Sequence, residues 1–176
     1  MEAPRLILVT GIPGAGKTTV CREAAGLLPR AAHIEADALS DMVVGGRVLP
    51  GEEPEAESGA QLELRTRNVA ALAENLLLAG FTVFIDDVVT GNHRLDGYLE
   101  ALWIAPDEIV VLAPAVEVAL SRDRHRPDKT VAERWAHLDG RLRSELADVG
   151  VWLDTSEMSV TATVTAVLAA CDLDGA

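Results

Sequence analysis

The chain of 176 residues is short of aromatic residues, of cysteine and of positive charge. Phe, Trp and Tyr make up only 3% of it, so its core must be packed mainly from aliphatic side chains. Its two cysteines imply no disulfide framework. Near the start, the apolar run over residues 6–10 is too short for a signal peptide or a membrane span. We therefore expect a cytoplasmic protein without a membrane partner.

The excess of negative charge limits the partners that the protein can bind. Asp and Glu number 28 against 15 Lys and Arg, which gives a formal net charge of −13. Such a field repels a long polyanion, so we expect no long nucleic acid as a partner. A small phosphorylated ligand is compatible with this charge, because a few local cations and backbone N–H groups suffice to bind it. The sequence does not predict the oligomeric state.

What the sequence contains is an alternation of short apolar runs with longer segments of helical period. This pattern predicts parallel strands joined by crossover helices, an α/β fold that forms a single domain over residues 1–176. The strand candidates are residues 5–10, 31–36, 81–86, 108–113 and 149–154. Apolar residues at helical spacing mark helices around residues 20–28, 69–76, 135–146 and 160–171.

One segment, residues 45–59, departs from this alternation. It is rich in Gly, Pro and Glu, which predicts a solvated loop, and Ser58 is a candidate cap for the helix that follows. Two interpretations stay open, a surface excursion and a loop beside the acceptor of a reaction.

The clearest motif is "GIPGAGKT", which lies between the first predicted strand and the first predicted helix. Gly11, Gly14, Gly16, Lys17 and Thr18 fill the pattern G-x-x-x-x-G-K-[ST] of a phosphate-binding loop. Backbone N–H groups and the helix N-terminus there favour an anion, Lys17 would reach the β- and γ-phosphates, and Thr18 would ligate Mg²⁺. We therefore expect ATP and Mg²⁺ as cofactors. The remaining nucleotide-contacting candidates in this motif are Pro13, Ala15 and Thr19.

Other parts of the sequence narrow the class of nucleotide-binding protein. The guanine-reading Asn-Lys-x-Asp run of GTPases is missing after the fourth predicted strand, and 176 residues leave little chain for the lids of a large ATPase. A kinase-like domain is the class that fits.

Asp37 follows the second predicted strand, at the sheet edge where ligands bind in open α/β folds. A carboxylate there can accept the proton of a hydroxyl that attacks the γ-phosphorus, so Asp37 is the candidate general base. The alternative is that it caps a helix beginning at Ala38.

Two adjacent carboxylates, Asp86 and Asp87, end the third predicted strand. Strand alternation sends them to opposite faces, so they should serve different purposes. Asp86 is the candidate for holding Mg²⁺ and Asp87 for touching the acceptor, but the sequence does not decide which residue does which. Both could instead bind loop amides.

The stretch over residues 121–129 concentrates the positive charge of Arg122, Arg124, Arg126 and Lys129. We expect an arginine lid at about 121–130, in which Arg122 and Arg126 neutralise the transferring phosphoryl group. A solvated basic helix end is the alternative. The histidines show no metal-site spacing, and we expect His93 in a loop and His33 as a packing or surface residue.

Together, "GIPGAGKT", Asp37 in "IEADAL", "FIDDVV" and the arginine stretch resemble a group of small P-loop kinases. This group contains the chloramphenicol phosphotransferase-like and polynucleotide-kinase-like enzymes and is related to the AAA-type zeta toxins. The resemblance implies a P-loop kinase-like three-layer sandwich whose five-stranded parallel sheet has the order 2-3-1-4-5. It also implies that Lys17 binds phosphate, Thr18 the metal and Asp37 the acceptor proton, with Arg122 and Arg126 in a mobile lid.

These observations predict a phosphotransferase that moves the γ-phosphate of ATP to a hydroxyl of a small molecule, an antibiotic or a metabolite. Two alternatives stay open, a kinase of nucleosides, nucleotides or 5′-hydroxyl nucleic-acid ends, and a regulatory ATPase gated by nucleotide. The glutamates of the loop hint at a cationic acceptor. On the helix after this loop, Arg65 and Arg67 are expected to face solvent rather than the acceptor.

Overall fold

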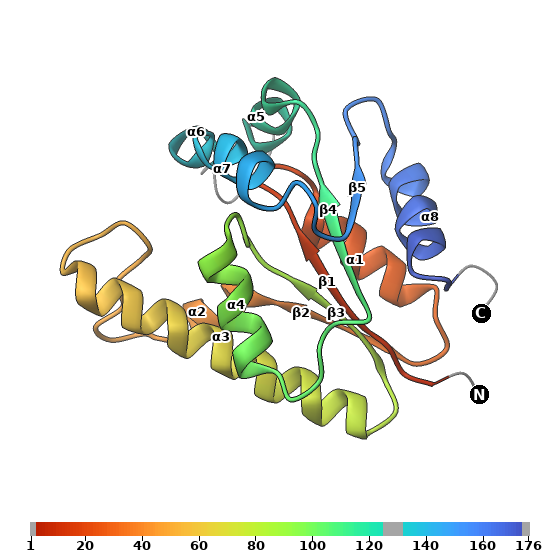
Figure 1. Ribbon diagram of the computed structural model, residues 1–176, viewed down its shortest axis with the longest axis horizontal. Coiled ribbons are helices and arrows are strands. Elements are labelled where there is room, and N and C mark those ends of the chain that lie inside the picture. The colour runs from red at the N-terminus through yellow and green to blue at the C-terminus, as the bar shows by residue number, and fades with distance from the viewer. Residues whose placement is uncertain (1–2, 125–131, 174–176) are drawn as a thin grey trace.

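A computed structural model describes residues 3–124 and 132–173 of the chain. Its core is one sheet of five parallel strands in the order β2-β3-β1-β4-β5 (Figure 1). The α/β class and this strand order confirm the expectation from the sequence. The strands are β1 (Leu6–Thr10), β2 (Ala31–Glu35), β3 (Thr82–Asp86), β4 (Glu108–Leu112) and β5 (Val151–Leu153).

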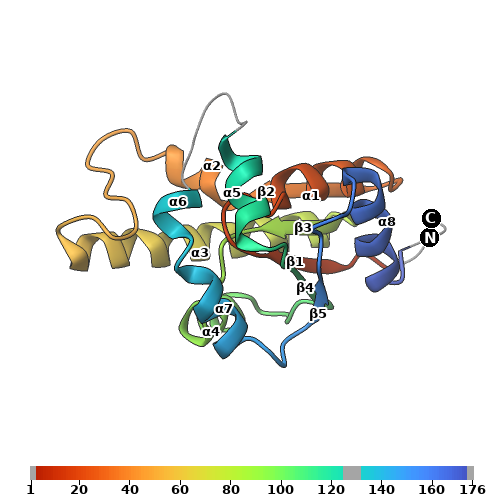
Figure 2. The same ribbon diagram turned by 90° about the horizontal axis from the view of Figure 1, so that it is seen from above.

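Helices cover both faces of the sheet and make a three-layer architecture (Figures 1 and 2). One face packs against α1 (Lys17–Gly26) and α8 (Val160–Ala170). The other packs against α3 (Glu55–Leu78), α4 (Asn92–Ala101) and α7 (Leu138–Glu145). Three further helices lie near the carboxyl ends of the strands, namely α2 (Ala36–Asp41), α5 (Val116–Arg124) and α6 (Ala132–Trp135).

The central strand β1 shows why the sheet needs both helical layers. All five of its residues are buried, with Ile7 and Val9 in the core under α1 and α8. Leu6 and Leu8 alternate with them and lie in the core on the α3 side. A strand with apolar residues on both faces is stable only when each face is covered, and each such buried side chain contributes about 1.5–3 kcal/mol.

Several local predictions need correction. Helix α3 begins at Glu55, so Ser58 lies inside its first turn and donates to the Leu49 carbonyl instead of capping the helix. The helix expected over residues 135–146 is two helices, α6 and α7, and Trp135 ends the first of them. His93 lies in α4 rather than in a loop.

These differences share a cause. Apolar spacing marks a helical face without showing where the helix stops, and α4 buries only Leu95 and Tyr98, which is too weak a pattern to detect. Of the described helices, none is both long enough and apolar enough to cross a membrane.

Candidate active site

The glycine-rich loop connects β1 to α1 at the carboxyl edge of the sheet. The backbone of neighbouring segments packs closely against it. Gly14 has φ 85°, and a Cβ atom there would lie 2.3 Å from the Ala119 carbonyl oxygen of α5. Gly11 has φ 146°, and its Cβ would lie 2.4 Å from the Leu112 carbonyl oxygen. Only glycine fits either position, because the left-handed conformation and the close contact both exclude a side chain.

Lys17 begins α1 directly after Gly16, whose φ is 97°. Its buried Nζ donates to the carbonyls of Gly11 at 3.0 Å and Ile12 at 3.3 Å, so the ammonium group lies inside the loop. Thr18 follows in the first turn and is partly buried, and that turn holds no acidic residue. A helix N-terminus with a buried cation beside it fits a triphosphate. Within the same motif Ala15 is buried, Pro13 is partly buried and Thr19 is exposed.

Asp86 and Asp87 lie on opposite faces of the sheet. Asp86 follows Phe84 on the face of α1, and its Oδ2 lies 3.4 Å from Nε2 of His33, with both side chains largely buried. Burial, and then the negative charge of Asp86, raises the pKa of Cys21 in α1, while Lys17 opposes this shift. Asp86 and Lys17 therefore both act on Cys21, on the α1 side of the sheet behind the loop.

Asp87 is the centre of a buried charge network on the other face. Its Oδ1 accepts a hydrogen bond from Arg65 Nη2 at 2.6 Å. Its Oδ2 accepts from Arg94 Nη2 at 2.9 Å and from the Tyr98 hydroxyl at 2.8 Å. Arg65 also donates through Nη1 to Oδ1 of Asp37 at 3.0 Å, so one guanidinium group joins the two carboxylates. The network connects α2, α3, β3 and α4.

The ionisation of this network follows from its contacts. Burial alone would raise the pKa of Asp87, but the charges of Arg65 and Arg94 and the bond from Tyr98 hold that pKa below its ordinary value. Burial would likewise lower the pKa of Arg65, but Asp87 and Asp37 raise it. Burial, and then the charge of Asp87, raises the pKa of Tyr98 well above its ordinary value. At neutral pH the protonated Tyr98 hydroxyl therefore donates to an ionised Asp87 carboxylate.

Asp37 lies in the first turn of α2 and is no helix cap, since the capping position belongs to Glu35. Its side chain is 51% exposed although it is bound to Arg65, whose own side chain is only 8% exposed. A buried arginine thus orients a carboxylate that is open to a pocket.

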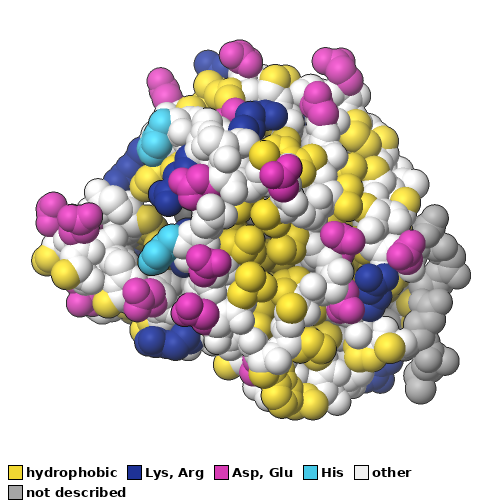
Figure 3. All heavy atoms as spheres, viewed as in Figure 1, with side chains coloured by type: hydrophobic (Ala, Val, Ile, Leu, Met, Phe, Trp, Pro, Cys, Tyr) yellow, Lys and Arg dark blue, Asp and Glu magenta, His cyan; other side chains and the backbone are white. Residues whose placement is uncertain are grey.

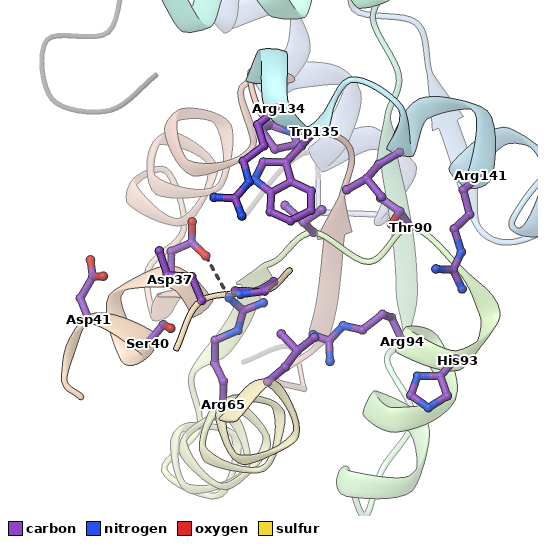
Figure 4. Close-up of a pocket in the computed structure, with 16 residues that line it drawn as sticks. Asp37, Ser40, Asp41, Arg65, Thr90, His93, Arg94, Arg134, Trp135 and Arg141 are labelled. Carbon is purple, nitrogen blue, oxygen red and sulfur yellow. Dashed lines mark hydrogen bonds and ion pairs between the residues drawn. The ribbon is translucent and has the colours of Figure 1, made fainter. Parts of the chain in front are cut away.

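That pocket has a volume of about 380 Å³ and lies between the glycine-rich loop and five helices, α2, α3, α4, α6 and α7 (Figure 4). Pro13 of the loop and Asp37 of α2 both line it. Figure 4 shows Arg65 below the pocket pointing to Asp37, Trp135 above it, and Arg94 and Arg141 on the side away from Asp37. The other lining residues include Leu49, Pro50, Leu62, Thr90, His93, Arg134 and Leu138.

The loop before α3 contributes to this pocket through its apolar residues, Leu49 and Pro50. Its glutamates bind backbone instead. Glu52 accepts from the Leu49 N–H at 2.9 Å, and Glu53 accepts from the Glu55 N–H at 3.0 Å. The acidic character of this segment therefore organises the loop and the start of α3 and does not line the pocket.

Arg122 lies near the glycine-rich loop but binds elsewhere. It is in α5, less than one turn after Ala119, whose backbone contacts Gly14. Its guanidinium group donates to the Thr155 carbonyl at 2.7 Å, beyond β5. Asp123 accepts a hydrogen bond from the Ala132 N–H at 2.8 Å and so joins α5 to α6. Arg126 and Lys129 lie outside the described residues.

Several residues of the site carry no signal that sequence reasoning detected. Arg65 lines the pocket, which corrects the expectation that it faces solvent, whereas Arg67 is exposed as expected. Arg94 lies on α4, far in the chain from Arg134 and Arg141, which lie on the separate helices α6 and α7, so no single helical pattern joins the three. Trp135 falls at the start of the helix expected around residues 135–146, but it ends α6 and lines the pocket.

Comparison with known proteins agrees with this architecture. A family model described as an AAA domain matches residues 6–143, which is more than half of the chain. The matched span contains the glycine-rich loop, Asp37, Asp86 and Asp87. A search of curated proteins finds no match.

Solved structures with the same fold include two kinases and a tunicamycin resistance protein. The tunicamycin resistance protein of Deinococcus radiodurans is 20% identical, with a TM-score of 0.64 over 96% of this chain and 95% of that one. A sugar kinase from Janibacter sp. is 20% identical, with a TM-score of 0.60 over 97% and 96%. The thymidylate kinase of Candida albicans is 12% identical, with a TM-score of 0.67 over 97% and 92%. The chain therefore has a P-loop kinase-like fold, which in general binds nucleotides.

Proposed function

Because this chain belongs to the AAA domain family, we propose that it is a phosphotransferase that moves the γ-phosphate of ATP to a hydroxyl of a small molecule. The observation that carries the proposal is that Pro13 of the glycine-rich loop and Asp37 line the same pocket. A nucleotide held by that loop would present its terminal phosphate to a compound bound beside Asp37.

The donor side needs positive charge and hydrogen-bond donors around the phosphates. Lys17 already lies inside the loop, and the N-terminus of α1 adds backbone N–H groups. Thr18 and Asp86 are the residues that would hold Mg²⁺, which would neutralise negative charge on the phosphates when bound.

The transfer itself requires one bond to form, one to break and one proton to move. The acceptor oxygen attacks the γ-phosphorus, and the bond from phosphorus to the β–γ bridging oxygen breaks, with its electron pair leaving on ADP. The proton of the acceptor hydroxyl goes to the carboxylate of Asp37. A positioned base of this kind contributes about 10²- to 10⁴-fold to the rate.

Arg65 prepares Asp37 for this step. The guanidinium group occupies one oxygen of Asp37 while it is anchored on the buried Asp87. The Asp37 carboxylate therefore has a fixed direction, which lowers the entropy lost on reaching the reactive geometry. In this scheme Asp87 helps to position Asp37 through Arg65, and Asp86 would help to hold Mg²⁺.

The arginine lid is the remaining part of the proposal. Arg122 and Arg126 would neutralise the charge that spreads over the phosphoryl oxygens during transfer. For Arg122 this requires that it leave the Thr155 carbonyl, which it binds in the structure. The contact of α5 with Gly14 keeps its helix beside the phosphates in either position.

A screen of acceptors tests the proposal. The protein is incubated with ATP, Mg²⁺ and a panel of hydroxyl-bearing metabolites and antibiotics, and mass spectrometry detects products that are heavier by one phosphoryl group. We expect an acceptor-dependent product that is absent with the Lys17→Ala variant. ATP hydrolysis that no acceptor changes would contradict the proposal in favour of a regulatory ATPase, and labelling of a 5′-hydroxyl oligonucleotide would favour a nucleic-acid kinase.

A further inference from the structure

The lining of the pocket is rich in positive charge, whereas the molecule as a whole is negatively charged. Acidic side chains are spread over the face seen in Figure 3, in keeping with the net charge of −13. Four arginines nevertheless line the pocket, out of 15 Lys and Arg in the whole chain. They come from α3, α4, α6 and α7, so the fold gathers them and no local run of basic sequence explains them. They are Arg65, Arg94, Arg134 and Arg141.

Two of the four arginines are already committed to carboxylates. Arg65 binds Asp37 and Asp87, and Arg94 binds Asp87 and the Thr66 hydroxyl. Their charges are therefore largely neutralised within the network. Arg65 and Arg94 therefore form part of the pocket wall, and the other two arginines are the candidates for binding a charged group of the ligand.

The other two arginines have N–H donors that their contacts with described residues do not use. Arg141 uses Nε for Glu145 at 2.7 Å, and no described residue accepts a hydrogen bond from its terminal nitrogens. Arg134 makes no ion pair with any described residue, and its guanidinium group lies 5.0 Å from the centre of the Trp135 ring. A guanidinium group held over an aromatic ring is pre-oriented, which favours binding of a planar or tetrahedral anion.

Besides Asp37, Ser40, Asp41, Thr90 and His93, the rest of the lining is apolar. Trp135 forms one wall, and Leu49, Leu62 and Leu138 complete it. The Trp135 ring is supported by Gly51, where a Cβ atom would lie 3.2 Å from it. A pocket of about 380 Å³ with apolar walls and separated polar groups suits one small organic compound.

We propose that the acceptor is a hydroxylated compound that also carries a carboxylate or phosphate group, which Arg134 and Arg141 bind. The inference rests on the proposed function and adds the substrate class. The hydroxyl lies beside Asp37, the anionic group lies against the arginines that α6 and α7 contribute, and the carbon skeleton lies against Trp135. A carboxylate and a phosphate both fit the planar fork of N–H donors of arginine, so the geometry points to an anionic group of either kind.

This class differs from the cationic acceptor at which the acidic loop hints in the sequence. The glutamates of the loop bind backbone, while Leu49 and Pro50 face the pocket. Asp41, the other lining carboxylate besides Asp37, is paired with Arg47. Two lining carboxylates that already have arginine partners are a poor site for an ammonium group.

Separation of metabolites by charge tests the inference directly. A mixture of small metabolites is divided by ion exchange into anionic, neutral and cationic fractions, and each fraction is incubated with ATP, Mg²⁺ and the protein. We expect the new phosphorylated product from the anionic fraction. Prior treatment of that fraction with phosphatase distinguishes the sources, because it removes a phosphate-bearing acceptor and leaves a carboxylate-bearing one. A product from the neutral or cationic fraction alone overturns the inference but keeps the proposed function, whereas no product in any fraction contradicts both.

Substitution of the two arginines provides the second measurement. With the acceptor found in that screen, Arg134→Gln and Arg141→Gln should each raise the acceptor KM about ten- to hundredfold, the loss expected for a hydrogen bond between charged groups. The KM for ATP should not change. Arg67→Gln is the matched control, because it removes one exposed arginine outside the pocket and should leave both KM values unchanged. An unchanged acceptor KM in both pocket variants overturns the inference.

Discussion

The two halves of the candidate site are built in different ways. The donor half is one contiguous segment, residues 11–18, and its geometry depends on backbone that packs so closely that no side chain fits at Gly11 or Gly14. The acceptor half is made of side chains from α2, α3, α4, α6 and α7, held by the charge network around Asp87. We therefore expect added side-chain atoms to disrupt the donor half and removed side-chain atoms to disrupt the acceptor half.

The largest effect on stability is expected from removal of the arginine that connects the acceptor half. Arg65→Leu leaves the buried Asp87 with one cation instead of two and should lower the free energy of unfolding by about 3–5 kcal/mol, as for other broken buried pairs. Urea unfolding followed by circular dichroism measures it. Arg67→Leu, at an exposed position of the same helix, is the control and should change stability by less than about 0.5 kcal/mol. A loss below about 1 kcal/mol for Arg65→Leu would show that the network does not hold the acceptor half together.

The donor half should respond to a single added methyl group. Gly14→Ala places a Cβ atom 2.3 Å from the Ala119 carbonyl oxygen at a left-handed φ, which should cost about 1–3 kcal/mol of stability and weaken nucleotide binding. Gly26→Ala, at the other end of α1, meets no atom within 4 Å and should be neutral or slightly stabilising. Thermal unfolding with and without ATP compares the two variants. Equal behaviour of the two variants would contradict the view that backbone contact shapes the loop.

Acid should weaken the acceptor half through Asp87. The folded pKa of this carboxyl lies below its ordinary value of about 3.9, so its contribution to stability is complete above that pH and is lost as pH falls through the folded pKa. The difference in unfolding free energy between the wild type and Asp87→Asn should therefore be constant from pH 7 to about 5 and shrink below about 4. Urea titrations at stepped pH measure this difference. A difference that grows with acid would contradict the assigned direction of the shift.

The smallest effect is expected from the acidic loop. Glu55 and Glu57 lie exposed in the first turn of α3, where negative charge favours the helix, so Glu55→Gln and Glu57→Gln should each cost about 0.3–1 kcal/mol. The acceptor KM should stay within about twofold, since exposed charges outside the pocket are screened. A tenfold rise in that KM would show that the loop binds the acceptor after all.

The contrast between a contiguous donor half and a dispersed acceptor half also explains what could be predicted from the sequence. The five strands and the glycine-rich loop depend on residues close together in the chain, so apolar runs and one motif located them. The order 2-3-1-4-5 came from resemblance to known kinases, and the structure confirms it. Alternation along a strand was also enough to send Asp86 and Asp87 to opposite faces.

The acceptor half could not be predicted in this way. Arg65 was expected on a solvated face, because nothing local shows that Asp37 and Asp87 converge on it from 28 and 22 residues away. Trp135 lines the pocket at the end of α6, where a helix breaks, and apolar spacing does not show such a break. The glutamates of the loop hinted at a cationic acceptor although Glu52 and Glu53 bind backbone, because composition does not reveal which of a segment's side chains face inward.

The central claim is that Asp37 takes a proton from an acceptor hydroxyl, and one variant tests it most directly. Asp37→Asn keeps the shape of the side chain and removes the base. Nucleotide affinity is measured by isothermal titration calorimetry, and transfer to the acceptor is measured in a single turnover. The account predicts unchanged nucleotide affinity and a transfer rate lower by about 10²- to 10⁴-fold. Transfer at the wild-type rate would contradict it.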